Sequence, residues 1–164
     1  MQLRDTVELL SYQIWANEKL ITFLGNLEHE AFIKEAGSSF SSIRDTLVHI
    51  IGAEELWLSR WRGEEGRGLL NPADFPNYRV LLDRWINHRM ELEVFIGTLE
   101  EGELKRQVSY KNIHGVPYSL ELWKQLLHVS NHSSYHRGQI NTLMRQVGLT
   151  PPSFDLIYYY LGER

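Results

Sequence analysis

Apolar residues recur at intervals of three and four along most of the chain, which is the spacing of one face of an α-helix. Four stretches follow this pattern, at residues 3–24, 43–62, 78–99 and 120–147. Gly25 and Gly148 follow the first and last stretches, where helices commonly end. Ser41 or Ser42 precedes the second stretch and Ser119 the fourth, and serine is a favoured N-cap. The pattern therefore predicts four long amphipathic helices.

The segments between these helices are longer than the usual connections of an up-and-down bundle. Residues 63–77, GEEGRGLLNPADFPN, are rich in Gly, Pro and Asn and indicate a loop. Residues 107–119, QVSYKNIHGVPYS, alternate around His114-Gly115, which favours a small hairpin or extended excursion. We therefore predict an all-α fold, a four-helix bundle with long connections. At least one connection should cross the bundle, and the hairpin should precede the last long helix.

The chain has 164 residues, which is enough for one domain over residues 1–164 with a core of its own. Its formal net charge is −4 and its basic residues are scattered, so nucleic acid is not expected as a partner. The absence of cysteine excludes disulfides, thiolate zinc sites and a cysteine nucleophile. We find neither a signal-type segment nor a run of about 18 apolar residues, and we expect a cytoplasmic protein with no membrane partner.

Residues 128–140, HVSNHSSYHRGQI, carry three histidines spaced four apart within the last predicted helix. Positions four apart on a helix are separated by about 40° and about 6 Å, so His132 and His136 can bind one ion. His128 and His136 are about 12 Å apart along the axis, which is too far for one metal. The spacing alone is also compatible with partly buried histidines that only make hydrogen bonds.

A metal site between helices needs a further ligand from another helix. His49 lies at the edge of the apolar face of the second predicted helix, and His88 lies within the apolar stripe of the third. Periodicity leaves these two as equal candidates, and either is also compatible with a hydrogen-bonded core histidine. We assign His29 and His114 to loops and give them no role.

Three segments carry a resemblance to a known family: YQIWANEKL at 12–20, TLVHIIGAEELWLSRW at 46–61 and HVSNHSSYHRGQI at 128–140. Together they resemble the DinB/YfiT-like family, which is unrelated to the DNA polymerase that shares the first name. The resemblance spans essentially the whole chain. It implies that His49, His132 and His136 are metal ligands, and that His128 packs beside them without binding the metal.

The resemblance implies chemistry at an open metal site, since relatives include thiol-dependent transferases and isomerases as well as many proteins of unknown activity. Three neutral imidazoles favour a divalent transition metal such as Zn²⁺, Ni²⁺ or Fe²⁺ and leave a position for water or substrate. We therefore expect a metal-dependent hydrolase or thiol transferase that acts on a small molecule. The alternative is a non-catalytic bundle that binds metal or a partner protein in a stress response.

No residue of the sequence stands out as a general base. Glu54, Gln125 and Gln139 fall on or near the interior faces of their helices, where they could orient ligands or substrate. An interior Glu or Gln is, however, more often an ordinary hydrogen-bonded polar group at the rim of the core. The terminal segment FDLIYYYL is more apolar than a solvated tail needs to be. It should pack on its own bundle or on a second subunit, and the resemblance implies a homodimer.

Overall fold

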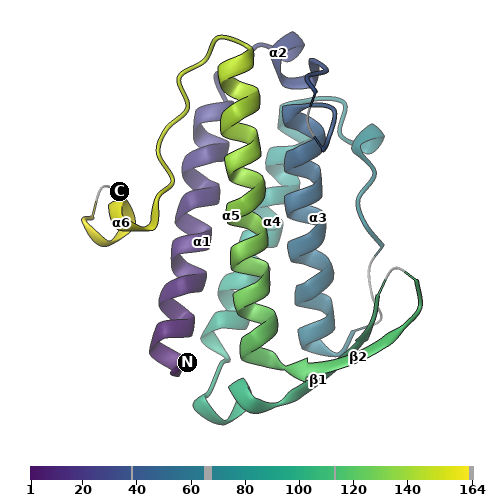
Figure 1. Cartoon of the computed structure of the whole chain (residues 1–164), viewed down its shortest axis with the longest axis vertical. Helices are drawn as coiled ribbons and strands as arrows, with labels where there is room; N and C mark the ends of the chain where they lie inside the picture. Colours follow the sequence, from purple (N-terminus) through teal and green to yellow (C-terminus); the bar gives the residue numbers. More distant parts are fainter. Residues whose placement is uncertain (38, 65–67, 113, 163–164) are drawn as a thin grey trace.

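The computed structural model of the chain describes residues 1–37, 39–64, 68–112 and 114–162, and these residues are mostly helical (Figure 1). The long helices are α1 (Leu3–Leu24), α3 (Ile43–Arg62), α4 (Tyr78–Gly97) and α5 (Leu122–Gln146). The short elements are α2 (His29–Ile33), η1 (Pro72–Asp74), η2 (Glu101–Lys105), β1 (Gln107–Lys111), β2 (Pro117–Glu121) and α6 (Leu156–Tyr160). The prediction of a mainly helical chain with a small hairpin before the last long helix is confirmed.

The four long helices lie side by side, and each contacts two of the others. α1 packs against α4 and α5, and α3 packs against the same two helices. α1 and α5 run in one direction, whereas α3 and α4 run in the other (Figure 1). Because α3 and α4 are parallel, the connection at residues 63–77 returns along the length of the helices, as the predicted crossing connection requires. Residues 65–67 of this connection lie outside the described part of the chain.

The start of α5 differs from the prediction. Ser119 does not cap this helix, because it pairs with Ser109 in the antiparallel hairpin of β1 and β2. The N-cap is Glu121, the last residue of β2, so the strand leads directly into the helix. Ser42, one of the two predicted caps of α3, does act as a cap and accepts a hydrogen bond from the backbone N–H of Asp45 at 3.1 Å.

The interior contains two apolar clusters separated along the helices by a polar layer. One cluster includes Leu20, Ile50 and Ile140, and the other includes Leu58 and Leu126. Buried polar side chains lie between them, and they come from all four long helices: Asn17, Glu54, His88, Ser133 and Arg137. Buried polar groups require partners, so this layer fixes how the middle turns of the helices face one another.

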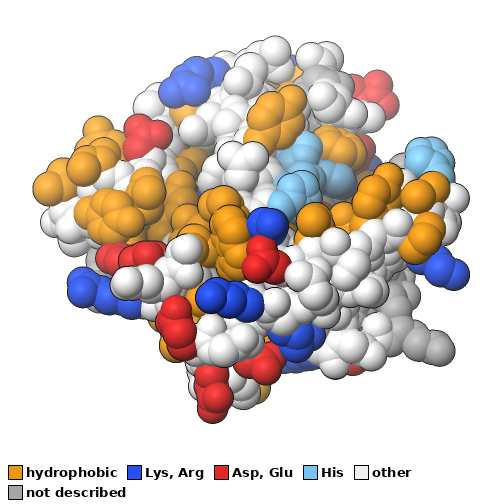
Figure 2. Space-filling view, turned by 60° about the horizontal axis from the view of Figure 1, so that its bottom comes forward, with side chains coloured by type: hydrophobic (Ala, Val, Ile, Leu, Met, Phe, Trp, Pro, Cys, Tyr) orange, Lys and Arg blue, Asp and Glu red, His pale blue; other side chains and the backbone are white. Residues whose placement is uncertain are grey.

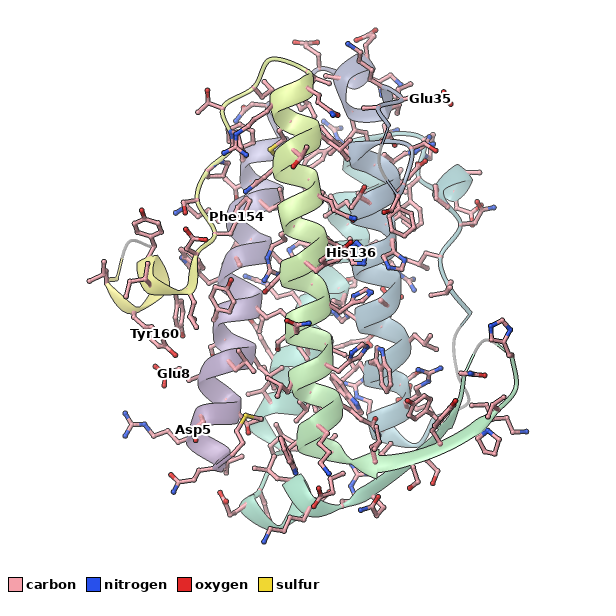
Figure 3. The ribbon with its side chains drawn as sticks, viewed as in Figure 1. Asp5, Glu8, Glu35, His136, Phe154 and Tyr160 are labelled. Carbon is pink, nitrogen blue, oxygen red and sulfur yellow. The ribbon has the colours of Figure 1, made fainter. Side chains whose placement is uncertain are left out.

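The C-terminal segment packs on its own chain, beside α1 (Figures 1 and 3). Phe154 is buried, and its carbonyl oxygen accepts a hydrogen bond of 2.8 Å from the hydroxyl of Tyr12. The ring of Tyr159 lies 5.7 Å from that of Trp15. The segment therefore packs on its own bundle, which is the first of the two placements predicted for it. None of the helices in the described part of the chain combines the length and the apolar character that crossing a membrane requires.

Candidate metal centre

Three of the predicted site residues come together in the middle of the molecule. His49 projects from α3, and His132 and His136 project from α5 toward it. Figure 3 labels His136. The Nε2 atom of His132 lies 3.2 Å from that of His49 and 3.1 Å from that of His136. One ligand atom of each residue lies within 4.8 Å of the others. The site spans the α3–α5 interface, which is the most extensive contact between two elements of the described chain.

These distances fit a single transition-metal ion. Nitrogen ligands at about 2.0–2.1 Å in a tetrahedral arrangement are separated from one another by about 3.3 Å. The two short Nε2 separations lie close to that value. Three nitrogen ligands without a carboxylate or thiolate suit zinc, nickel or iron, and they leave a coordination position open.

Gln139 sets the orientation of one of the three rings. Its Oε1 lies 2.7 Å from Nδ1 of His136, three residues earlier on the same helix. A carboxamide oxygen can only accept a hydrogen bond, so Nδ1 carries the proton and Nε2 presents its lone pair. The amide nitrogen of Gln139 donates in turn to Oγ of Ser39 at 3.2 Å. The predicted orienting role of Gln139 therefore corresponds to a contact in the structure.

The environment of the three histidines favours their neutral form. Burial lowers the pKa of His49 to about 4, with a further contribution from His136. Burial also lowers the pKa of His132 to about 4, and the neighbouring histidines act in the same direction. Burial lowers the pKa of His136 as well, although the hydrogen bond that its Nδ1–H donates to Gln139 acts against this lowering. Because a metal binds only the neutral imidazole, these environments favour the form that can act as a ligand.

Aromatic side chains enclose one side of the centre. The ring of Phe40 stacks on that of His49 at 4.3 Å between centres, and it meets the edge of His136 at 5.5 Å. Figure 2 shows histidine side chains gathered in a hollow with hydrophobic side chains around it. A pocket of about 460 Å³ opens beside the centre, and its lining residues are His128, Asn131, His132, Ser134 and Tyr135. A small molecule can therefore reach His132 from this side.

The remaining histidines lie away from the three ligand atoms. The ring of His128 packs 5.3 Å from Trp57 and 5.8 Å from His132 between centres, as expected for a residue that packs beside the site. His88 is fully buried in the polar layer, and His114 lies in the hairpin turn. His29 was assigned to a loop but is the first residue of the short helix α2.

The other two residues that could have oriented ligands have different partners. Glu54 is buried and accepts hydrogen bonds from Asn17 at 2.9 Å and Ser133 at 2.6 Å, and its second oxygen lies 3.0 Å from Nε2 of His88. Burial would raise the pKa of this carboxyl, but the hydrogen bonds and the charge of His88 lower it overall. Gln125 donates to the carbonyl oxygens of Val108 and Leu120 and thereby fixes the hairpin to α5.

The sequence analysis gave no role to Arg137, although this residue lies directly after His136. Its guanidinium is buried and donates to Asn17 at 2.7 Å and to Ser134 at 2.8 Å. Asn17 also donates to Glu54, so the two opposite charges are joined through one amide. The signal in the sequence was the unusual placement of an arginine beside an apolar stripe. Phe40 was missed because it lies in the loop before α3, outside any periodic segment.

Fold and site together define a mostly helical protein with a cluster of three histidines that could hold a metal ion. The sequence profile of the DinB family matches residues 1–163, and the chain belongs to this family. It is similar to Protein DinB of Bacillus subtilis (strain 168), with 23% identity over 159 residues that cover 93% of this chain and 91% of that protein. The crystal structure of a DinB-like protein from Bacillus cereus ATCC 10987 superposes with a TM-score of 0.72 at 21% identity, and the match covers 93% of this chain and 97% of that one.

Proposed function

We propose that this protein is a metal-dependent hydrolase or transferase whose site is built across a four-helix bundle, with His49, His132 and His136 as the metal ligands. One observation carries the proposal, which is the convergence of three neutral imidazole nitrogens from two helices at distances that suit one ion. An ordinary hydrogen-bonded histidine would point its ring at a carbonyl or hydroxyl group instead.

When bound, the ion supplies two positive charges and an open coordination position, which lower the pKa of a water or thiol placed there. The protein's own residues hold and orient this position. Gln139 fixes the His136 ring, Phe40 covers the His49 ring, and the pocket beside His132 admits the substrate. We propose a small molecule as the substrate, and a thiol is the class that the family resemblance favours.

A second candidate function is non-catalytic binding of metal or of a partner protein in a stress response. The observation in its favour concerns the carboxylate of Glu54, the buried acid of the polar layer. Both of its oxygens are engaged by Asn17, Ser133 and His88, so it is not free to accept a proton from substrate. Among the described residues, the histidine cluster includes no carboxylate that could act as a general base.

Elemental analysis of the purified protein, followed by activity panels, separates the two functions. Stoichiometric transition metal together with metal-dependent turnover in thiol-transfer or hydrolysis assays supports the enzyme. Stoichiometric metal with no turnover across a broad panel supports the binding protein. A protein that binds no zinc, nickel or iron contradicts the metal site, both for the enzyme and for the metal-binding protein.

We also propose that the protein forms a homodimer. The C-terminal segment buries Phe154 on its own chain but leaves the apolar side chains of Ile157, Tyr160 and Leu161 exposed. Exposed apolar side chains grouped on one segment favour contact with another subunit. Light scattering at micromolar concentration should give twice the mass of the chain, and a monomer mass would contradict the dimer.

A further inference from the structure

The surface between the metal centre and the hairpin carries a cation without an anionic partner. The guanidinium carbon of Arg60 lies 4.6 Å from the centre of the Trp57 ring and 4.7 Å from that of Tyr110. Nη2 donates to the carbonyl oxygen of Lys111 at 2.9 Å. Within the part of the chain that the structure describes, no carboxylate pairs with Arg60 and its other N–H groups have no acceptor.

Two other arginines, Arg62 and Arg84, do have carboxylate partners. Arg62, two residues later, bonds to the side chain and the backbone of Glu91, and Arg84 on α4 bonds to Glu55 through two nitrogens. Burial lowers the pKa of Arg60, because its charged form has lost part of its hydration without gaining a carboxylate. A cation held in fixed geometry against the rings of Trp57 and Tyr110, with unused donors, is suited to bind an anion.

Arg60 lies on the same face of α3 as the metal ligand His49. The two residues are eleven positions apart, so their directions differ by about 20° and they are separated by about 16 Å along the axis. Trp57 lies between them along the helix, and the centre of its ring lies 4.8 Å from that of Tyr110 and 5.3 Å from that of His128. A row of rings therefore connects Arg60 with the metal centre.

Figure 2 shows hydrophobic surface beside the histidines. Hydrophobic side chains border the histidines and continue toward the right edge of the view, the side on which the hairpin lies in Figure 1. Tyr118 extends this apolar surface onto β2, since its ring stacks on that of Tyr110 at 5.8 Å between centres and the residue is 47% exposed.

We propose that Arg60 is a specificity-determining residue that binds a carboxylate at the far end of an elongated substrate. The reacting end of this molecule reaches the three histidines, and its apolar middle lies on the rings of His128 and Trp57. Binding at both ends, by the three histidines and by Arg60, explains why a charged side chain and a row of rings adjoin an open metal position. This inference rests on the proposed function, because it assigns the substrate of the same site.

The first experiment measures thiol binding to the protein loaded with Co²⁺. The probes are a mercapto-fatty acid long enough to reach from the centre to Arg60 and the mercapto-alcohol of the same length. Both are followed by the absorption band that appears when a thiolate binds cobalt. The acid should bind about 10–100-fold more tightly than the alcohol, the gain typical of hydrogen bonds to a charged group. Arg60→Gln should abolish this preference, and Arg60→Lys should retain part of it.

Lys111→Gln is the matched control, because it removes one positive charge from the exposed side of β1 and leaves the carbonyl that Arg60 uses. This variant should keep the preference for the acid. Equal affinity for acid and alcohol in the wild-type protein would overturn the proposal. A preference that survives Arg60→Gln would overturn it as well, because general attraction would then account for the binding.

The second experiment separates the inference from the proposed function. Metal-free protein is titrated with a plain alkanoate of the same length, and the Nε–H signal of Arg60 is followed by NMR. A saturable shift of this signal supports the carboxylate site even if neither thiol reaches the cobalt, in which case only the thiol chemistry fails. If the thiols bind cobalt but the Arg60 signal does not move, the metal centre stands and the carboxylate site is wrong.

Discussion

The Oε1 atom of Gln139 lies 2.7 Å from Nδ1 of His136, and this contact determines which nitrogen of the ring is available to a metal. Without it, the ring could carry its proton on Nε2, and that nitrogen would then be unable to bind an ion. Gln139, which selects the tautomer, therefore belongs to the centre as much as His136 does.

We therefore expect Gln139→Ala to weaken zinc binding about 10–100-fold, which is the usual cost of losing a group that orients a ligand. Gln139→Glu should preserve binding, because a carboxylate accepts the same hydrogen bond. Competition with a chromophoric chelator measures both affinities. Equal affinity in the wild type and in Gln139→Ala would show that the contact does not select the tautomer.

Single substitutions of histidine by alanine should separate ligands from neighbours. The variants at His49, His132 and His136 should lose nearly all bound metal, because two imidazoles remain in each. His128→Ala should keep its metal with at most a 10–100-fold loss of affinity, since the ring packs beside His132 without joining the cluster. Metal content of protein purified under identical conditions is the measurement.

His88→Ala should show the opposite behaviour, with normal metal content and lower stability. The substitution removes the group that bonds Oε2 of the buried Glu54 and leaves a cavity in the polar layer. The free energy of unfolding should fall by about 2–4 kcal/mol. If metal content collapses for His88→Ala and survives for His49→Ala, the ligands have been assigned to the wrong residues.

The sequence predicted the helices well because their signal is local. Apolar periodicity, with Gly25 and Ser42 at helix ends, located all four long helices to within about two residues. The alternation around Gly115 located the hairpin. Ser119 was misread because a serine before an apolar run can precede a helix or lie in a strand. Whether Ser119 caps the helix or lies in the strand depends on its pairing with Ser109 across the hairpin, which the residues next to Ser119 do not specify.

The centre could be predicted only in part for the same reason. The spacing of His132 and His136 is a property of one helix and is readable from the sequence. Whether His49 or His88 joins them depends on how α3 and α4 are rotated against α5, which periodicity does not determine. The family resemblance favoured His49, and the structure brings that residue to the pair while His88 bonds to Glu54.

Removal of the metal should lower the melting temperature without unfolding the protein. An ion that bridges α3 and α5 binds the folded chain far better than the unfolded one, and at about 100 times the dissociation constant it adds about 2.7 kcal/mol. For a chain of this size that corresponds to a shift of about 5–10 °C. The two apolar clusters should maintain the fold at room temperature. Calorimetry with and without a chelator checks this, and an unchanged melting temperature after verified metal removal would contradict the bridge.

Acid should destabilise the metal-free protein through His49 and His132. Burial lowers the pKa of both to about 4 in the folded chain, from an ordinary value of 6.5. Between these values the unfolded chain binds more protons than the folded one, so stability should decline as the pH falls from 6.5 toward 4. Urea unfolding at a series of pH values from 7 to 5, in the presence of chelator, measures the slope. Replacement of both residues by glutamine should flatten it, and an equally steep slope in the double variant would assign the acid sensitivity to other groups.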